Sequence, residues 1–298
     1  MASAALVAAE SILALTPIAI KKTPLDPISA IWSRILTAGV LGYIISEEKS
    51  LSVPEIGAAT LLGYVNLLHI ASSYEAFRNL PAGQAMSILY TYPLWNLLFN
   101  AHINNELIQP REYGLMATAA VGSALLNYNP GETVVAASGG KPVASWGMCM
   151  SIVAAFTESG MHVVLKRLGW RDPAKSVWVV SAGASIWLLA YIGLQAMTDH
   201  LSYPIVRGSA FDALMLTAFH GVSTFAGYYL RFFAVPRLST VMYSFLSYSG
   251  LFASYLFGIW FLGETPGIVS IIGALLILVS GIMLQIQVKP SQQKPTST

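Results

Sequence analysis

Three ionisable side chains interrupt a long apolar run at residues 156–167, FTESGMHVVLKR. Glu158, His162 and Lys166 are spaced four residues apart, so on an α-helix they lie along one face. Charged groups inside a membrane cost roughly 3 kcal/mol on insertion scales, and those that occur tend to line pathways for substrates or protons. The stripe therefore predicts a polar site that binds a substrate or exchanges a proton. The structural alternative is a neutralised acid, a hydrogen-bonded core histidine and a lysine that reaches the membrane interface.

Other polar side chains within apolar runs extend this candidate site. Glu10 lies in the first apolar run, and Arg34 lies seven residues into the second. A guanidinium can hold a substrate carboxylate with two hydrogen bonds, or it can act as a structural clamp on a neighbouring acid. The remaining candidates are two residues three apart in the third run and three tyrosines placed deeper than interfacial anchors: Asn66, His69, Tyr90, Tyr92 and Tyr243.

Motifs for covalent chemistry and for cofactors are missing from the sequence. It has no Gly-rich phosphate loop, no H-E-x-x-H and no G-x-S-x-G. The five histidines are scattered, and Cys149 is the only cysteine, so no metal-ligand spacing occurs. A net charge of +2 gives no reason to expect nucleic acid as a partner. We therefore expect no cofactor, no metal and no enzymatic activity.

The elements that must position these residues are membrane helices. Of 298 residues, 55% are hydrophobic and only 10% are charged, against roughly 25% charged in a soluble domain. A membrane span needs about 20 mostly apolar residues. Ten such runs predict an all-α, multi-pass integral membrane protein, with spans near 3–21, 28–46, 55–76, 82–103, 111–128, 144–165, 175–197, 210–230, 239–262 and 267–287.

The loops between these runs predict the orientation. With the N-terminus in the cytoplasm, the inside loops carry ten lysines and arginines, including Lys175 and Arg231, and the outside loops carry five. Because positive charge is enriched in cytoplasmic loops, both termini are expected there. The membrane itself is not indicated.

Two halves of the chain resemble each other. Glu10-Ser11 and Asp26-Pro27 in the first half are echoed by Glu158-Ser159 and Asp172-Pro173, at offsets of 148 and 146 residues. Five spans per half is an odd number, so the second half enters the membrane with opposite polarity. Inverted repeats of this kind are typical of secondary transporters. The expected organisation is a first repeat (1–128), a linker (129–143), a second repeat (144–287) and a disordered tail (288–298).

The fifth and tenth predicted helices are expected to pack outside a central cavity, which the other eight helices line. Each of the two carries a pair of glycines eight residues apart, Gly114 with Gly122 and Gly273 with Gly281. Small residues on one face allow close helix packing. Glu106, before Pro110, is interpreted as part of the turn that starts the fifth helix.

Residues 76–126 and 232–284 resemble the drug/metabolite transporter superfamily, whose EamA-like members carry two five-helix units. Residues 24–45, with Arg34, are similar to the second helix of that family. The stretch MHVVLKR (161–167) is similar to the sixth helix of the sister branch of nucleotide-sugar and sugar-phosphate translocators. Met161 stands where that branch has a basic residue, which argues against phosphorylated substrates.

The resemblance implies a secondary-active transporter of small polar organic metabolites, such as amino acids, that works by alternating access and is driven by a gradient or by exchange. Within the same superfamily, a nucleotide-sugar or sugar-phosphate antiporter is the alternative. A receptor or assembly protein of the membrane is the alternative from another class. The expected partners are a small-molecule substrate and the lipid bilayer, and a homodimer is left open.

Overall fold

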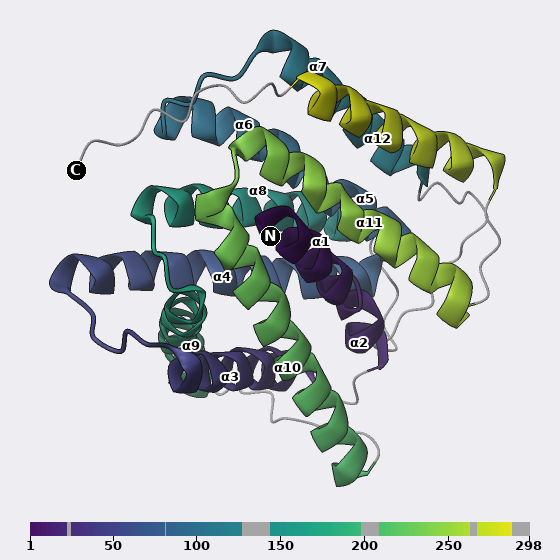
Figure 1. The fold of residues 1–298 in the computed structure, drawn as a ribbon. Helices are drawn as coiled ribbons and strands as arrows, with labels where there is room; N and C mark the ends of the chain where they lie inside the picture. The colour runs from purple at the N-terminus through teal and green to yellow at the C-terminus, as the bar shows by residue number, and fades with distance from the viewer. Residues whose placement is uncertain (23–24, 81, 127–143, 198–208, 263–266, 288–298) are drawn as a thin grey trace.

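The computed structural model describes residues 1–22, 25–80, 82–126, 144–197, 209–262 and 267–287, and within them the chain is helical and contains no strand (Figure 1). The helices are α1 (Ala2–Leu13), α2 (Thr16–Lys22), α3 (Pro27–Ile45), α4 (Val53–Asn79), α5 (Ala82–Leu89), α6 (Tyr92–Ile103), α7 (Pro110–Leu126), α8 (Ala144–Leu168), α9 (Pro173–Met197), α10 (Ala210–Ala234), the short 3₁₀-helix η1 (Val235–Arg237), α11 (Thr240–Leu262) and α12 (Ile268–Gln287). The expected linker (129–143) and tail (288–298) lie outside the described residues.

Two of the predicted helices are broken, which corrects the sequence analysis. The first predicted span is divided into α1 and α2, and the fourth into α5 and α6. The reason is a proline in each: α1 ends at Leu13, four residues before Pro17, and α5 ends at Leu89, four residues before Pro93. A proline has no N–H for the carbonyl four residues back and its ring clashes with that carbonyl, so the helix stops there.

The repeated Asp-Pro pair is a helix start in both halves. Asp26 caps α3, accepting hydrogen bonds from the backbone N–H groups of Ile28 and Ser29 at 2.9 and 3.2 Å. Asp172 accepts one from the N–H of Ala174 at 2.9 Å at the start of α9. In each case the proline takes the first helical position, where no N–H is needed.

The central helices pack closely because glycines lie where they cross. α4 lies between α8 and α9, α3 packs against α9 and α10, and α1 packs against α10 and α11. At the crossing of α4 and α9, a Cβ on Gly63 would fall on the backbone of Gly183, so only glycine permits this approach.

The predicted outer pair of helices is found at the edge of the fold. α7 packs against α12, and the two run side by side at the upper edge of Figure 1. A Cβ on Gly122 would lie 2.8 Å from the carbonyl oxygen of Gly273, so Gly122 belongs to the packed face as predicted. Gly114 does not, because nothing lies within 4 Å of a Cβ placed there.

Five helices are long and apolar enough to cross a membrane: Ala2–Ile20, counted as one span, Pro27–Ile45, Val53–Asn79, Ser145–Leu168 and Pro173–Met197. These five coincide with the first, second, third, sixth and seventh predicted spans. The described part of the chain therefore supports a multi-pass membrane protein by length and composition, while the full set of ten spans stays a prediction.

Candidate functional site

Arg231 is the centre of the polar core. It lies on α10, only 6% exposed, and it contacts acids from two other helices. Its Nε and Nη2 donate to Oε1 of Glu10, on α1, at 3.0 and 2.7 Å. Its Nη1 donates to Oε1 of Glu158, on α8. The two acids that the sequence identified as repeat-mates therefore share one guanidinium, whose planar fork allows it to serve both.

Two tyrosines complete the surroundings of Glu10. The hydroxyl of Tyr90 donates to Oε2 of Glu10 at 3.2 Å, and that of Tyr92 donates to Oε1 at 3.5 Å. The break between α5 and α6 lies at these residues and turns both side chains toward α1. Gly250 on α11 leaves the space, since a Cβ there would overlap the Tyr90 hydroxyl. Glu10, fully buried, is thus held by three donor side chains.

His69 on α4 contacts the second acid in a way that requires a proton. Its Nδ1 lies 3.0 Å from the carbonyl oxygen of Ala154, which can only accept, so Nδ1 carries a hydrogen. In the neutral ring Nε2 then has a lone pair, yet Nε2 faces Oε2 of Glu158 at 3.4 Å. Two lone pairs repel, so a proton belongs in this contact, on His69 or on Glu158.

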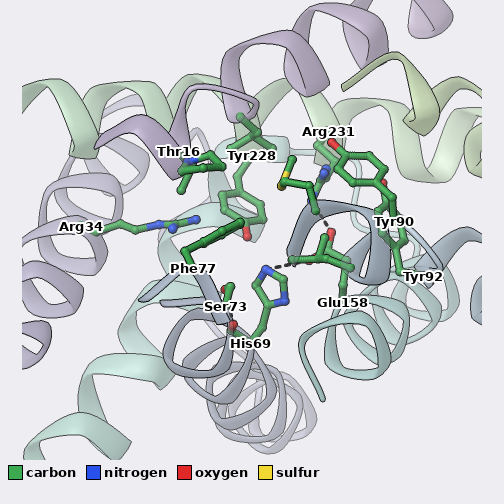
Figure 2. Close-up of a pocket in the computed structure, with 14 residues that line it drawn as sticks. Thr16, Arg34, His69, Ser73, Phe77, Tyr90, Tyr92, Glu158, Tyr228 and Arg231 are labelled. Carbon is green, nitrogen blue, oxygen red and sulfur yellow. Dashed lines mark hydrogen bonds and ion pairs between the residues drawn. The ribbon is translucent and has the colours of Figure 1, made fainter. Parts of the chain in front are cut away.

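A cavity of about 60 Å³ adjoins these groups (Figure 2). Arg34, His69, Glu158 and Arg231 line it, from four different helices. The remaining lining residues are Leu13, Thr16, Pro17, Ser73, Phe77, Met86, Leu89, Tyr90, Tyr92 and Tyr228. The volume admits a few water molecules.

Three predicted site residues lie away from this cavity. The ring of His162 lies 4.1 Å from that of Tyr243, centroid to centroid, and neither residue lines the cavity. Both ring nitrogens of His162 are buried without a hydrogen-bond partner among the described residues. Asn66 lines a second cavity, of about 20 Å³, which shares Arg34 and Tyr228 with the first. α9 lines this smaller cavity and a third one, of about 500 Å³, which it shares with α3 and α4, whereas α11 lines none of the three.

The third member of the predicted stripe has a partner at the helix end. Nζ of Lys166 lies 2.7 Å from a carboxylate oxygen of Glu106 and donates to Oγ1 of Thr240 at 2.6 Å. Lys166, for which the structural alternative was a lysine at the membrane interface, thus has an acid partner, and Glu106 contributes an ion pair in addition to its interpreted place in the turn. The pair joins the end of α8 to the segment between α6 and α7.

A second set of contacts joins the start of α9 to the segment between α3 and α4. Nζ of Lys175 binds carboxylate oxygens of Glu48 and Glu55, each at 2.8 Å. Asp172 accepts a hydrogen bond from the hydroxyl of Ser46 at 2.7 Å and one from the backbone N–H of Glu47 at 3.2 Å. Burial raises the pKa of Asp172, but these hydrogen bonds outweigh it and hold the pKa below its ordinary value.

Sequence reasoning missed Arg231 and misplaced Lys175, because both were assigned to cytoplasmic loops. Arg231 is 6% exposed and lies within α10, so it does not belong in the count of loop charges. Lys175 is 5% exposed and lies in the first turn of α9. The predicted eighth span ended at residue 230, whereas α10 continues to Ala234. The signal was present in the apolar residues that follow, FFAVP at 232–236, which place Arg231 inside an apolar run.

Comparison with known proteins supports the predicted resemblance. The model of the EamA-like transporter family matches residues 1–128, consistent with the drug/metabolite transporter superfamily. A solved structure, described only as a crystal structure of a protein, aligns with a TM-score of 0.71 over 96% of each chain at 16% sequence identity, which shows the fold alone. No curated protein was found that matches the sequence. With the apolar helices, the family match indicates an integral multi-pass membrane protein of the transporter type.

Proposed function

We propose that this membrane protein is a secondary-active transporter of small polar organic metabolites, such as amino acids, that works by alternating access between two inverted five-helix repeats. The observation that carries the proposal is the bridge from Arg231 to Glu10 and Glu158. The bridge joins α1 of the first half to α8 and α10 of the second, and Glu158 lies midway along α8. Buried ionisable groups in that position tend to lie on transport pathways. The protein has no enzymatic role in this proposal, and both termini lie in the cytoplasm.

The helix contacts support a twofold relation between the halves. If the predicted spans of the two halves are matched in order, α1 corresponds to α8, α4 to α10, and α6 to α11. α1 packs against α10 and α11, and the corresponding contacts of α8 with α4 and α6 also occur. α3 with α9, and α7 with α12, are pairs of equivalent helices that meet each other. Two halves related in this way can rock about a site at their shared axis.

The contacts at the helix ends support a helix bundle that is closed at one end and has its cavity toward the other end. Glu55, which binds Lys175, is near the start of α4, whereas Phe77, which lines the cavity, is near its end. The 22 residues between them correspond to about 33 Å along the helix. The Lys175 and Lys166 contacts therefore hold together the end opposite to the cavity, and they must open when the site turns to that side.

In this proposal Glu158 is coupled to protons through its contact with His69. The proton required between it and His69 can leave or return as the halves move, because the lone-pair contact is unfavourable without it. The titratable and charged groups around it come from α1, α3, α4, α5–α6, α10 and α11: Glu10, Arg34, His69, Tyr90, Tyr92, Tyr228, Arg231 and Tyr243. A proton gradient is then the energy source, since no nucleotide-binding motif occurs in the sequence.

Two alternatives are less well supported. A sugar-phosphate or nucleotide-sugar antiporter needs several cations for its phosphates, but Arg231 is already bound by two acids. A receptor or assembly protein has no need of a proton in a buried contact between helices. A receptor or assembly protein also gives no role to a polar cavity at the meeting point of the two proposed repeats.

The test is transport by purified protein in proteoliposomes, over a panel of labelled amino acids and other polar metabolites, with and without a pH gradient. We expect uptake that depends on the gradient, and Glu158→Gln should insert normally yet lose most uptake or its pH dependence. Glu75→Gln is the matched control, because Glu75 is a partly exposed acid outside the cavity. Full, pH-dependent transport by Glu158→Gln would rule out its role, and no uptake of any compound by the parent would contradict the function.

A further inference from the structure

Arg34 differs from the other buried cations in having no acid beside it. Arg231 binds two carboxylates and Lys175 also binds two. Arg34, only 3% exposed, has no carboxylate partner within the described residues, and its Nε has no hydrogen bond there. Burying an unpaired charge is costly, so a site that retains one normally pairs it with something.

The surroundings of Arg34 leave its guanidinium facing the cavity. The rings of Tyr74 and Tyr228 lie 6.0 and 5.8 Å from it, and it also interacts with the Tyr74 hydroxyl. The Tyr228 ring lies 5.6 Å from Arg231 as well, so it separates the two guanidiniums (Figure 2). Arg34 lines both cavities, and the hydroxyl of Thr224 in the smaller one also has no hydrogen-bond partner in the described part of the chain.

The charges around the cavity carry an excess of one positive charge once a proton in the contact between His69 and Glu158 is counted. Arg34 and Arg231 supply two positive charges, and the two acids that bind Arg231, Glu10 and Glu158, supply two negative ones. The proton that the contact between His69 and Glu158 requires adds one more positive charge. The excess of one is at Arg34, because both acids already bind Arg231.

We propose that Arg34 binds the carboxylate of the transported substrate, so that the substrates are small organic carboxylates rather than phosphorylated compounds. This inference rests on the proposed function and specifies its substrate class. A planar guanidinium matches a carboxylate with two parallel hydrogen bonds. One carboxylate carries one negative charge and cancels the excess, whereas a phosphate ester carries roughly 1.5 to 2 negative charges at neutral pH and would leave some uncompensated.

Stability in the absence of substrate gives the first test. Arg34→Met removes an unpaired buried charge and keeps the apolar stem, so the variant should melt at the same temperature as the parent protein or higher. Arg231→Met, which removes a paired charge, should melt lower, and it serves as the contrast. If Arg34→Met melts as low as Arg231→Met, Arg34 is a structural partner and the proposal is wrong.

Binding gives the second test, read as the shift in melting temperature of the purified protein in detergent. The probes are propionate, L-alanine, propylamine and glycerol 3-phosphate, each titrated to saturation. Propionate and L-alanine together distinguish a simple acid from an amino acid as the source of the carboxylate. We expect at least one of them to raise the melting temperature of the parent protein, with an affinity at least tenfold weaker in Arg34→Met and partly kept in Arg34→Lys.

Other results would overturn the assignment. These are a stronger shift with glycerol 3-phosphate or propylamine than with either carboxylate, an unchanged affinity in Arg34→Met, or no shift with any probe. The transport assay separates this inference from the proposed function. A carboxylate that binds through Arg34 but is never taken up into proteoliposomes would contradict transport alone. Uptake that is unaffected by Arg34→Met would contradict the role of Arg34 alone.

Discussion

Arg231→Met is expected to destabilise the protein strongly. Methionine fits the volume of the arginine stem but leaves Glu10 and Glu158 without their shared cation. Glu10 is fully buried and keeps only the Tyr90 and Tyr92 hydroxyls as donors among the described residues. The protein must then either bury an uncompensated carboxylate or protonate it.

Protonation sets the upper limit of the penalty for each acid. A glutamate ordinarily titrates near pH 4.3, and each pH unit corresponds to 1.36 kcal/mol, so protonating one at pH 7 costs about 3.7 kcal/mol. Glu10 should incur most of this penalty. Glu158 should incur less because His69 remains beside it. The free energy of unfolding should therefore fall by about 4 kcal/mol, within the range of about 3–5 kcal/mol seen when one partner of a buried pair is removed.

The measurement is denaturant titration of the purified protein in mixed micelles. In the triple variant Arg231→Met, Glu10→Gln, Glu158→Gln all three charges of the bridge are removed, so it should recover most of the lost unfolding free energy. This variant also tests the reasoning if Arg231→Met alone does not fold. Arg237→Met is the control, because Arg237 is exposed, and it should change the unfolding free energy by less than about 0.5 kcal/mol. Arg231→Met as stable as the parent, or a triple variant no better than the single one, would refute the reasoning.

Three further predictions concern the ends and crossings of the helices. Either Lys166→Glu or Glu106→Lys alone should reduce transport, and the double variant, which exchanges the two charges of this ion pair, should restore it. A double variant that transports as poorly as the single variants would mean that the ion pair is not the important contact. Gly63→Ala should abolish folding or cost several kcal/mol, because its Cβ meets the backbone of α9. Gly57→Ala on the same helix, where nothing lies within 4 Å of the added Cβ, should stabilise the protein by about 0.5–1 kcal/mol. Equal melting temperatures of the two variants would contradict the crossing geometry. The pKa of Asp172 is lowered in the folded protein, so the contribution of Asp172 to stability is complete above its unfolded pKa of about 3.9 and is lost as the pH falls through its folded pKa. Between pH 2 and 7, the melting temperature of Asp172→Asn should therefore fall less on acidification than that of the parent protein. Identical pH profiles of the two proteins would show that the cap contributes nothing.

Features that depend on neighbours in the chain were predictable from the sequence. Asp26-Pro27 and Asp172-Pro173 start helices in both halves, because a carboxylate cap and an N1 proline act within one turn. Helical segments coincide with all ten predicted apolar runs, since apolar length alone predicts them. Pro17 and Pro93 also carried the information that two of these helices would break, although the sequence analysis did not use it to divide the spans.

The candidate site was partly predictable, because an ionisable group in an apolar run is conspicuous. Glu10, Glu158, Arg34 and His69 were identified in this way, and the structure places all four around one cavity or its ion pairs. Arg231 was missed through an error in a helix boundary, since four residues decided whether it counted as a loop charge or a buried one.

Only the tertiary structure decided which of these residues meet. Glu158 and His162 lie on one helix face, yet one contacts Arg231 of α10 and the other packs on the ring of Tyr243 of α11. Asn66 and His69 are three residues apart but line different cavities. The sequence by itself determined the helices, their caps and the faces that carry charge, since these follow from contacts within about one turn. The pairing of charges depends on how far each helix is shifted along its neighbour, and that shift is set by glycine crossings and proline breaks acting together over the whole fold.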